Sequence, residues 1–180
     1  MITSWKTKST AAALALCALA QPQIAMAEEC VEQADLSATV VYAMPLLGDA
    51  VNEKCSKELS PTGFMATKSE AFLAPYRAKQ DANWPGAFRL LKMFSKKGKA
   101  PSGMGDMIDS LPESALRPFV DAVIVTMVGK EIKPADCGKI ERGIALIAPL
   151  PEENVGDLAA FIFDMAEVKN PNLCPYRGDQ

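Results

Sequence analysis

The chain has 180 residues, of which 49% are hydrophobic and 23% charged, and its formal net charge is −3 at pH 7. These values are typical of a soluble globular protein of one domain, and they exclude a disordered chain, a collagen-like fibre and a polytopic membrane protein. The sequence contains no histidine. Its absence excludes Ser-His-Asp and Cys-His nucleophile systems, histidine zinc sites and an imidazole general base.

Residues 1–27 have the pattern of a cleaved secretory signal peptide. A basic start is followed by an apolar stretch at residues 10–20, and Ala25 and Ala27 provide the small side chains that a signal peptidase requires. The apolar stretch is too short to span a bilayer, which takes about 20 residues. We therefore expect the mature protein to be periplasmic or secreted, with no transmembrane segment after cleavage.

We expect residues 28–180 to form one helical domain with a tail from about residue 169. Four cysteines remain in this part: Cys30, Cys55, Cys137 and Cys174. Two disulfides are the expected state, because the cysteines lie too far apart along the chain for the close pairs of a thiolate metal site. Three pairings are possible.

Apolar residues recur every three or four positions from Leu36 to Leu59, which predicts a helix with one buried face. Pro45 and Gly48 interrupt this pattern. We therefore expect either a kink at these residues or two short helices around them.

Two further helices are predicted in the next part of the chain. The second is expected to begin at Thr67 or Ser69, each of which can cap a helix start. The third is expected to begin near Trp84, with Pro85 in its first turn and Gly98 after its last turn.

A short helix is predicted at residues 106–111, followed by a longer one from Pro112 to Gly129. Residues 123–128 are rich in β-branched side chains and would also suit a buried strand. The apolar pattern extends back to Leu116, however, and this length favours a helix.

Two helices are predicted at the end of the chain. The first begins at Pro134, and its expected inner positions are Cys137, Ile140, Ile144 and Ile147. Pro149 and Pro151 then force a sharp turn. The expected inner positions of the last helix are Val155, Leu158, Ile162 and Met165.

So short a connection predicts that the last two helices form an antiparallel hairpin. That arrangement would bring Cys137 close to Cys174, and it leaves Cys30 and Cys55 as the second pair by elimination. The whole sequence therefore predicts an all-α fold, a compact bundle of five to seven helices with two disulfides.

Charge gives the strongest functional signal. Residues 68–99 contain eight basic side chains and two acids, between acidic flanks, and Arg89, Lys92 and Lys96 share one face of the third helix. A basic face beside aromatic rings suits an anionic envelope component or an acidic partner protein. The candidate binding residues are Trp84, Arg89, Lys92, Lys96 and Lys99. The alternatives are a solvated helix face, or pairing with the protein's own acidic helices.

Other chemistry has weaker support. The acids Glu152, Glu153, Asp157 and Asp164 could serve a carboxylate-dependent hydrolase, but the helix dipole alone favours acids in a first turn. Met104 and Met107 would suit Cu(I), because thioethers bind this ion. Packing in a loop or in the core is the better explanation, since the sequence has only these two methionines close together and no histidine. The sequence contains no nucleotide-binding motif and no close set of metal ligands, so we expect no cofactor and no metal. We expect no nucleic-acid partner, because the chain is acidic and exported.

The sequence thus favours a non-catalytic binding or interaction module for an anionic envelope component or a partner protein. The alternatives are a carboxylate-dependent hydrolase of envelope polymers and a periplasmic stress chaperone. A chaperone would need carboxylates as its acid trigger, because histidine is absent.

Overall fold

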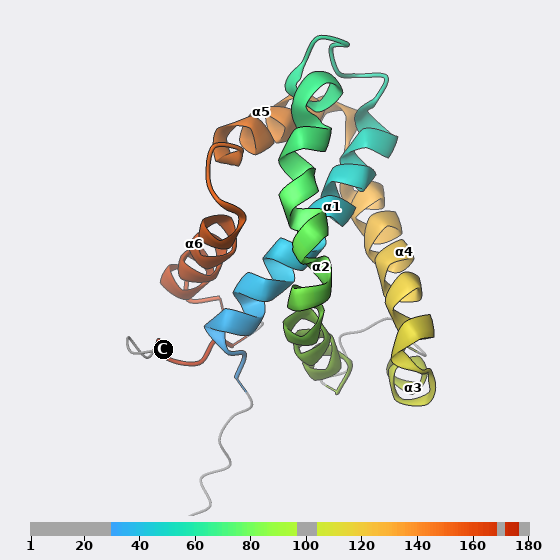
Figure 1. Cartoon of the computed structure of the whole chain (residues 1–180), viewed down its shortest axis with the longest axis vertical. Coiled ribbons are helices and arrows are strands. Elements are labelled where there is room, and N and C mark those ends of the chain that lie inside the picture. Colours follow the sequence, from blue (N-terminus) through green and yellow to red (C-terminus); the bar gives the residue numbers. More distant parts are fainter. Residues whose placement is uncertain (1–29, 97–103, 169–171, 177–180) are drawn as a thin grey trace, which may run out of the picture.

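The computed structural model describes residues 30–96, 104–168 and 172–176. Within these ranges the chain forms helices and no strand, apart from one isolated β-bridge between Val31 and Leu173. The elements are α1 (Gln33–Cys55), α2 (Phe64–Lys96), α3 (Met104–Ser110), α4 (Glu113–Glu131), the 3-10 helix η2 (Pro134–Asp136), α5 (Cys137–Ile147) and α6 (Glu152–Met165). Figure 1 labels the helices α1 to α6. The predicted all-α bundle of five to seven helices is confirmed.

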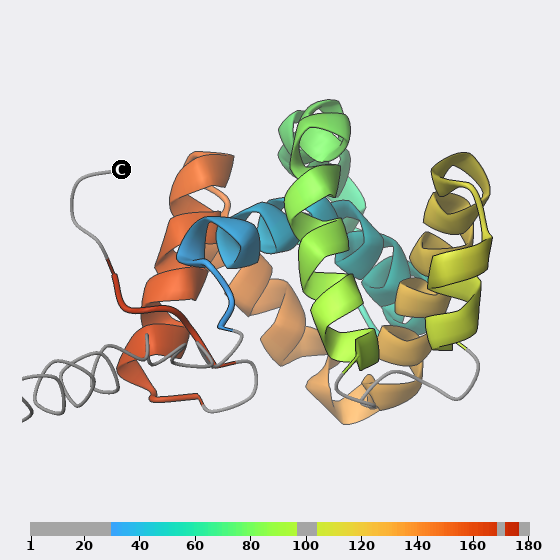
Figure 2. The same cartoon turned by 90° about the horizontal axis from the view of Figure 1, so that it is seen from below.

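Helix α1 is the centre of the fold, and α2, α4 and α6 pack around it. Figure 2 shows α6 and α4 on opposite sides of α1 and α2. On one side, Tyr42 lies in a buried cluster with Trp84 and Leu116. On another side, Met44 packs with Leu73 in a second cluster. Because its neighbours surround it, α1 is buried on more than the single face that its apolar periodicity predicted.

Helix α1 continues through Pro45 without a break, so the alternative of two short helices is wrong. Gly48 has a packing role instead. A Cβ atom at this position would lie 2.5 Å from Cδ1 of Leu73, so the absence of a side chain lets α2 approach α1 closely.

Helix α2 replaces the two separate helices that the sequence predicted, since it runs unbroken through Pro75 and Pro85. A proline inside a helix leaves the carbonyl four residues earlier without its donor. Here these carbonyls belong to Ala71 and Asp81, and both residues are exposed, so water can take over the missing hydrogen bonds. The solvent-facing position of both prolines explains why they are tolerated.

The second half of the chain follows the predicted order of elements. Residues 104–110 form the short helix α3, and residues 123–128 are helical within α4, which confirms the helix over the buried strand. Pro134 opens η2, and α5 follows directly.

Helix α6 packs against α1, and the expected hairpin with α5 is wrong. Its contact face consists of Val155, Gly156 and Ala160. A Cβ atom at Gly156 would lie 2.8 Å from the backbone oxygen of Ser37, so the two backbones come very close. Only small side chains fit such a contact, and the expected inner residues Leu158, Ile162 and Met165 are therefore exposed.

All four cysteines form disulfides, but the pairs are Cys30–Cys174 and Cys55–Cys137. The predicted pairing is wrong because it relied on the hairpin. The end of α1 instead lies beside the start of α5. Residues 172–174 lie beside the start of α1, where Val31 N donates to Asn172 O at 2.8 Å and Cys174 N donates to Val31 O at 2.9 Å.

No helix in the described ranges has both the length and the apolar character needed to cross a membrane. The predicted signal peptide lies outside the described residues.

Candidate functional site

The structure gives Trp84, one of the candidate binding residues, an internal role. Its side chain is buried, and its indole Nε1 donates to Glu113 Oε1 at the start of α4. Its ring stacks on Phe88 with the centroids 5.3 Å apart. In this structure the Trp84 side chain therefore has no face for an external partner.

The candidate basic residues of α2 also have partners within the chain. Arg89 donates through Nε and Nη2 to the two carboxylate oxygens of Asp35 on α1. The Nζ atom of Lys92 lies 4.3 Å from the centroid of the Phe88 ring. Lys99 and the side chain of Lys96 lie outside the described part of the chain. The anion-binding role of this face stays a prediction.

The remaining ion pairs of α2 agree with the alternative that the basic segment pairs with the protein's own acids. Arg77 bonds to Asp49 on α1 and to Glu70. Lys79 bonds to both Glu152 and Glu153 at the start of α6. The hydrogen bond from Lys79 holds the pKa of Glu152 below its usual range.

Three of the four acidic candidates of α6 are likewise involved in packing. Glu152 and Glu153 hold α6 to α2 through Lys79, and Asp157 accepts a 2.7 Å hydrogen bond from the Ser37 hydroxyl of α1. No group of three or more potential metal ligands occurs among the residues that the structure describes.

The structure shows a different candidate site, an apolar groove between α1, α2, the end of α4 and α5. Its volume is about 360 Å³, within the usual range of ligand pockets. The lining residues are Met44, Leu47, Gly48, Val51, Met65, Ser69, Phe72, Leu73, Val128, Ile132, Ile140, Gly143, Ile144 and Ile147. We refer to this feature as the apolar groove.

The apolar groove offers almost no polar contact. Ser69 is its one hydroxyl residue, and this hydroxyl already donates to the backbone oxygen of Met65. The lining residues that the structure describes include no acid, no base and no cysteine. Such a surface can bind an apolar group, but its described residues provide no general base, no thiol and no carboxylate.

The wall formed by α5 follows from its sequence. Ile140, Ile144 and Ile147 recur at intervals of four and three, so they share one helix face. Gly143 lies on the same wall, and a Cβ atom there would meet no other atom within 4 Å. The Cys55–Cys137 disulfide joins the first residue of α5 to the last residue of α1. This bond holds the wall at a fixed distance from α1.

The sequence predicted Ile140, Ile144 and Ile147 as inner positions, but it did not predict a groove. All three side chains are half-buried, because no described residue fills the space in front of them. The available signal was Gly143, a residue without a side chain on an otherwise apolar helix face. Its meaning depends on how far α5 lies from α1 and α2, which periodicity does not give.

The chain matches no protein-family model, and neither the curated proteins nor the solved structures contain a significant match to it.

Proposed function

We propose that this chain is an exported, non-catalytic binding protein whose apolar groove holds the hydrocarbon chain of an amphiphilic envelope component. The observation that carries the proposal is a groove of about 360 Å³ whose single hydroxyl is already bonded within the protein. The signal-peptide pattern and the two disulfides support export.

The chemistry of the lining favours a hydrocarbon chain over other ligands. Each peptide or sugar polar group that is buried without a partner loses about 1–3 kcal/mol, and the groove has no free side-chain partner to offer. At roughly 30 Å³ for each methylene, similar to the volume of a water molecule, the groove has room for about a dozen methylenes. Met44 and Met65 are flexible enough to adapt to a mobile chain.

This function is compatible with the anionic envelope component expected from the sequence. The hydrocarbon chain would lie in the groove and the charged head group would remain in solvent. The proposal assigns no role to Arg89 or Lys92, because both have partners within the chain.

The test is a titration of the mature, disulfide-bonded protein with saturated fatty acids of eight to sixteen carbons, followed by displacement of a dansylated undecanoic acid probe. Each buried methylene contributes about 0.8 kcal/mol, so affinity should rise roughly tenfold for each two added carbons. The increase should end near about twelve carbons, when the groove is full. Absence of saturable binding, or an affinity independent of chain length, would contradict the proposal.

Two glycines of α5 provide a matched pair of variants. Gly143→Phe should place a ring in the groove and weaken binding about tenfold or more. Gly138→Phe makes the same change five residues earlier, about 140° away around the helix, where a Cβ atom also meets nothing within 4 Å. The Gly138 variant should bind like the unmodified protein. Equal binding by the two variants would exclude the groove as the site.

A further inference from the structure

We infer a second binding surface, on α6, which docks a basic amphipathic segment of a partner protein. The surface has two adjoining parts. One is a stripe of exposed apolar side chains along the helix, and the other is a hollow lined with carboxylates beside it. We refer to them together as the α6 surface.

The apolar stripe is exposed to an unusual degree. Leu158, Phe161, Ile162 and Met165 are 42%, 54%, 53% and 68% exposed. Their spacing of three, one and three residues places them along one side of the helix. Large apolar side chains gathered on one helix face indicate an interaction site. They are available here because α6 uses its small residues against α1.

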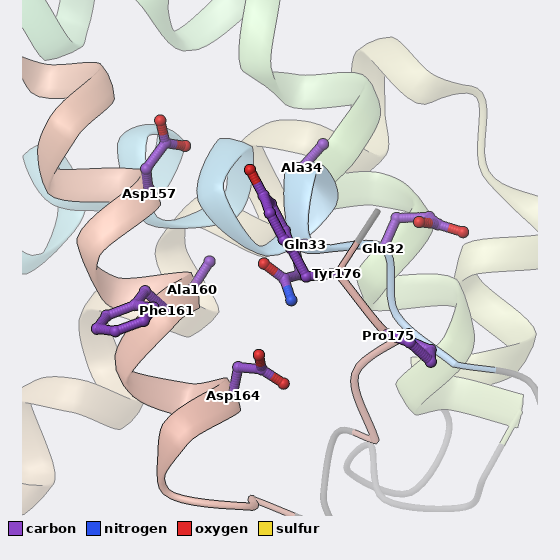
Figure 3. A pocket seen from close by; sticks show the side chains of 9 residues that line it. All are labelled: Glu32, Gln33, Ala34, Asp157, Ala160, Phe161, Asp164, Pro175 and Tyr176. Carbon is purple, nitrogen blue, oxygen red and sulfur yellow. The ribbon is translucent and has the colours of Figure 1, made fainter. Parts of the chain in front are cut away.

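The hollow has a volume of about 580 Å³ and lies between α6, the start of α1 and the end of the described chain. Figure 3 shows the side chain of Asp164 reaching from α6 into the space between this helix and Pro175. The rings of Phe161 and Tyr176 also line the hollow, and Tyr176 is 71% exposed. Phe161 therefore belongs to both parts of the α6 surface.

The charge of the side chains around the hollow indicates which kind of partner would bind there. Glu32, Asp157 and Asp164 line it, and none of its described lining residues is a lysine or an arginine. Within the described ranges, none of these carboxylates forms an ion pair. A lysine or arginine side chain would be attracted by the carboxylates, and it could also lie over an aromatic ring.

A peptide also matches the remaining polar group of the hollow. The Nε2 atom of Gln33 is buried and has no hydrogen-bond partner among the described residues. A backbone carbonyl of a bound segment is a suitable acceptor for this donor. A basic helix with apolar residues at the same three- and four-residue spacing would fit both parts of the surface.

The charges disfavour two other occupants. In a twofold dimer through α6, each surface would meet its own copy, so the carboxylates of both copies would lie close together. An anionic lipid surface would be repelled as well, and residues 152–165 contain no lysine or arginine to attract it. A basic partner protein is the occupant that the charges favour.

The test uses the mature, disulfide-bonded protein and two fluorescein-labelled helical peptides of 18 residues, one of leucine and lysine and the other of leucine and glutamate. Fluorescence anisotropy should show saturable binding of the lysine peptide, weaker at high salt, and no binding of the glutamate peptide. Equal binding of both peptides would overturn the inference, because it would show a general apolar surface without charge selection.

Two pairs of variants locate the binding. Asp164→Lys should weaken binding of the lysine peptide about tenfold, whereas Glu131→Lys, the same charge change at the exposed last residue of α4, should have little effect. Phe161→Ser should weaken it similarly, and Met127→Ser should not, although Met127 is 51% exposed. If the control variants weaken binding as much as the α6 variants, the inference is wrong.

The inference does not depend on the function proposed for the apolar groove. Gly143→Phe should leave lysine-peptide binding unchanged, so a failure of one proposal can be distinguished from a failure of the other. Sedimentation equilibrium of the protein alone gives one further test. A dimer that Phe161→Ser dissociates would show that a second copy occupies the surface, and would overturn the proposal of a basic partner.

Discussion

At the scale of single residues, two buried tyrosines of the core differ in their hydrogen bonds. The Tyr42 hydroxyl donates to Asp121 and accepts a 3.2 Å hydrogen bond from Nε of Arg117. The Tyr76 hydroxyl is buried and has no hydrogen-bond partner among the described residues. Tyr42→Phe should therefore lower the free energy of unfolding, whereas Tyr76→Phe should not.

Tyr42→Phe should lower the free energy of unfolding by about 1–2 kcal/mol, because Asp121 and Arg117 would lose a partner in a half-buried site. Tyr76→Phe removes an unpaired polar group and should leave the stability unchanged or raise it by up to about 1 kcal/mol. Urea unfolding of both variants measures the difference. A loss of stability in Tyr76→Phe as large as in Tyr42→Phe would mean that the Tyr76 hydroxyl is bonded in solution.

Alkaline pH should enlarge the advantage of Tyr76→Phe. Burial, together with the charge of Glu152, raises the pKa of Tyr76 from 10.0 to about 12. Between these values the unfolded state has already lost the proton and the folded state has not, so the free energy of unfolding falls as the pH rises. The slope for one such group approaches about 1.4 kcal/mol for each pH unit.

Urea unfolding at several pH values above 9 tests this expectation. Stability of the unmodified protein should fall more steeply above pH 10 than that of Tyr76→Phe, since the variant lacks this titration. Parallel decreases in the two proteins would show that Tyr76 titrates normally in the folded state.

The sequence predicted which side chains are notable better than it predicted the residues that these side chains contact. It identified Trp84 and Arg89 as notable, and it included pairing with the protein's own acids as an alternative. Arg89 bonds to Asp35, 54 residues earlier in the chain. Such a pair depends on the distance between two helices, and helical periodicity in one segment contains no information about that distance.

At the scale of helices, the sequence predicted where most elements lie but not which face of α6 is buried. Hydrophobic periodicity selected the large side chains Leu158, Ile162 and Met165. The structure buries the predicted Val155, but with it Gly156 and Ala160 in place of those three, because α6 lies very close to α1 at these positions. When a helix has both an apolar stripe and a stripe of small residues, its sequence does not show which stripe is buried until the neighbouring helix is known.

Two Gly→Ala substitutions test this explanation. Gly156→Ala should destabilise the fold by about 1–3 kcal/mol, because its Cβ would lie 2.5 Å from Ser37 Oγ and 2.8 Å from Ser37 O. Gly138→Ala adds a methyl group to open space on α5 and should be neutral or stabilise by up to about 1 kcal/mol. Thermal unfolding compares the two variants. Equal melting temperatures would mean that α6 does not approach α1 so closely.

At the scale of the whole molecule, each of the two disulfides lies beside one of the two proposed binding surfaces. Cys55–Cys137 holds α5 at the apolar groove, and Cys30–Cys174 holds residues 172–176 beside α6. The sequence predicted two disulfides from composition and export. The pairing required the angle between α5 and α6, which two prolines in a short connection do not determine.

The position of one disulfide beside each proposed surface predicts separable effects when each disulfide is removed by a double Cys→Ala substitution. Cys55→Ala with Cys137→Ala should weaken fatty-acid binding more than binding of the lysine peptide, because the α5 wall is no longer fixed to α1. Cys30→Ala with Cys174→Ala should have the reverse effect, because Glu32 and Tyr176 are no longer held together beside Asp164.

Each removal should also lower the free energy of unfolding by roughly 2–5 kcal/mol, since the bonds close loops of 82 and 144 residues. Both binding assays are therefore run well below the melting temperature, with circular dichroism as the check that the variant is folded. Folded variants that lose both activities to the same extent would show that the groove and the α6 surface are coupled through α1. Selective losses would show that each disulfide maintains one binding surface, in addition to its contribution to stability.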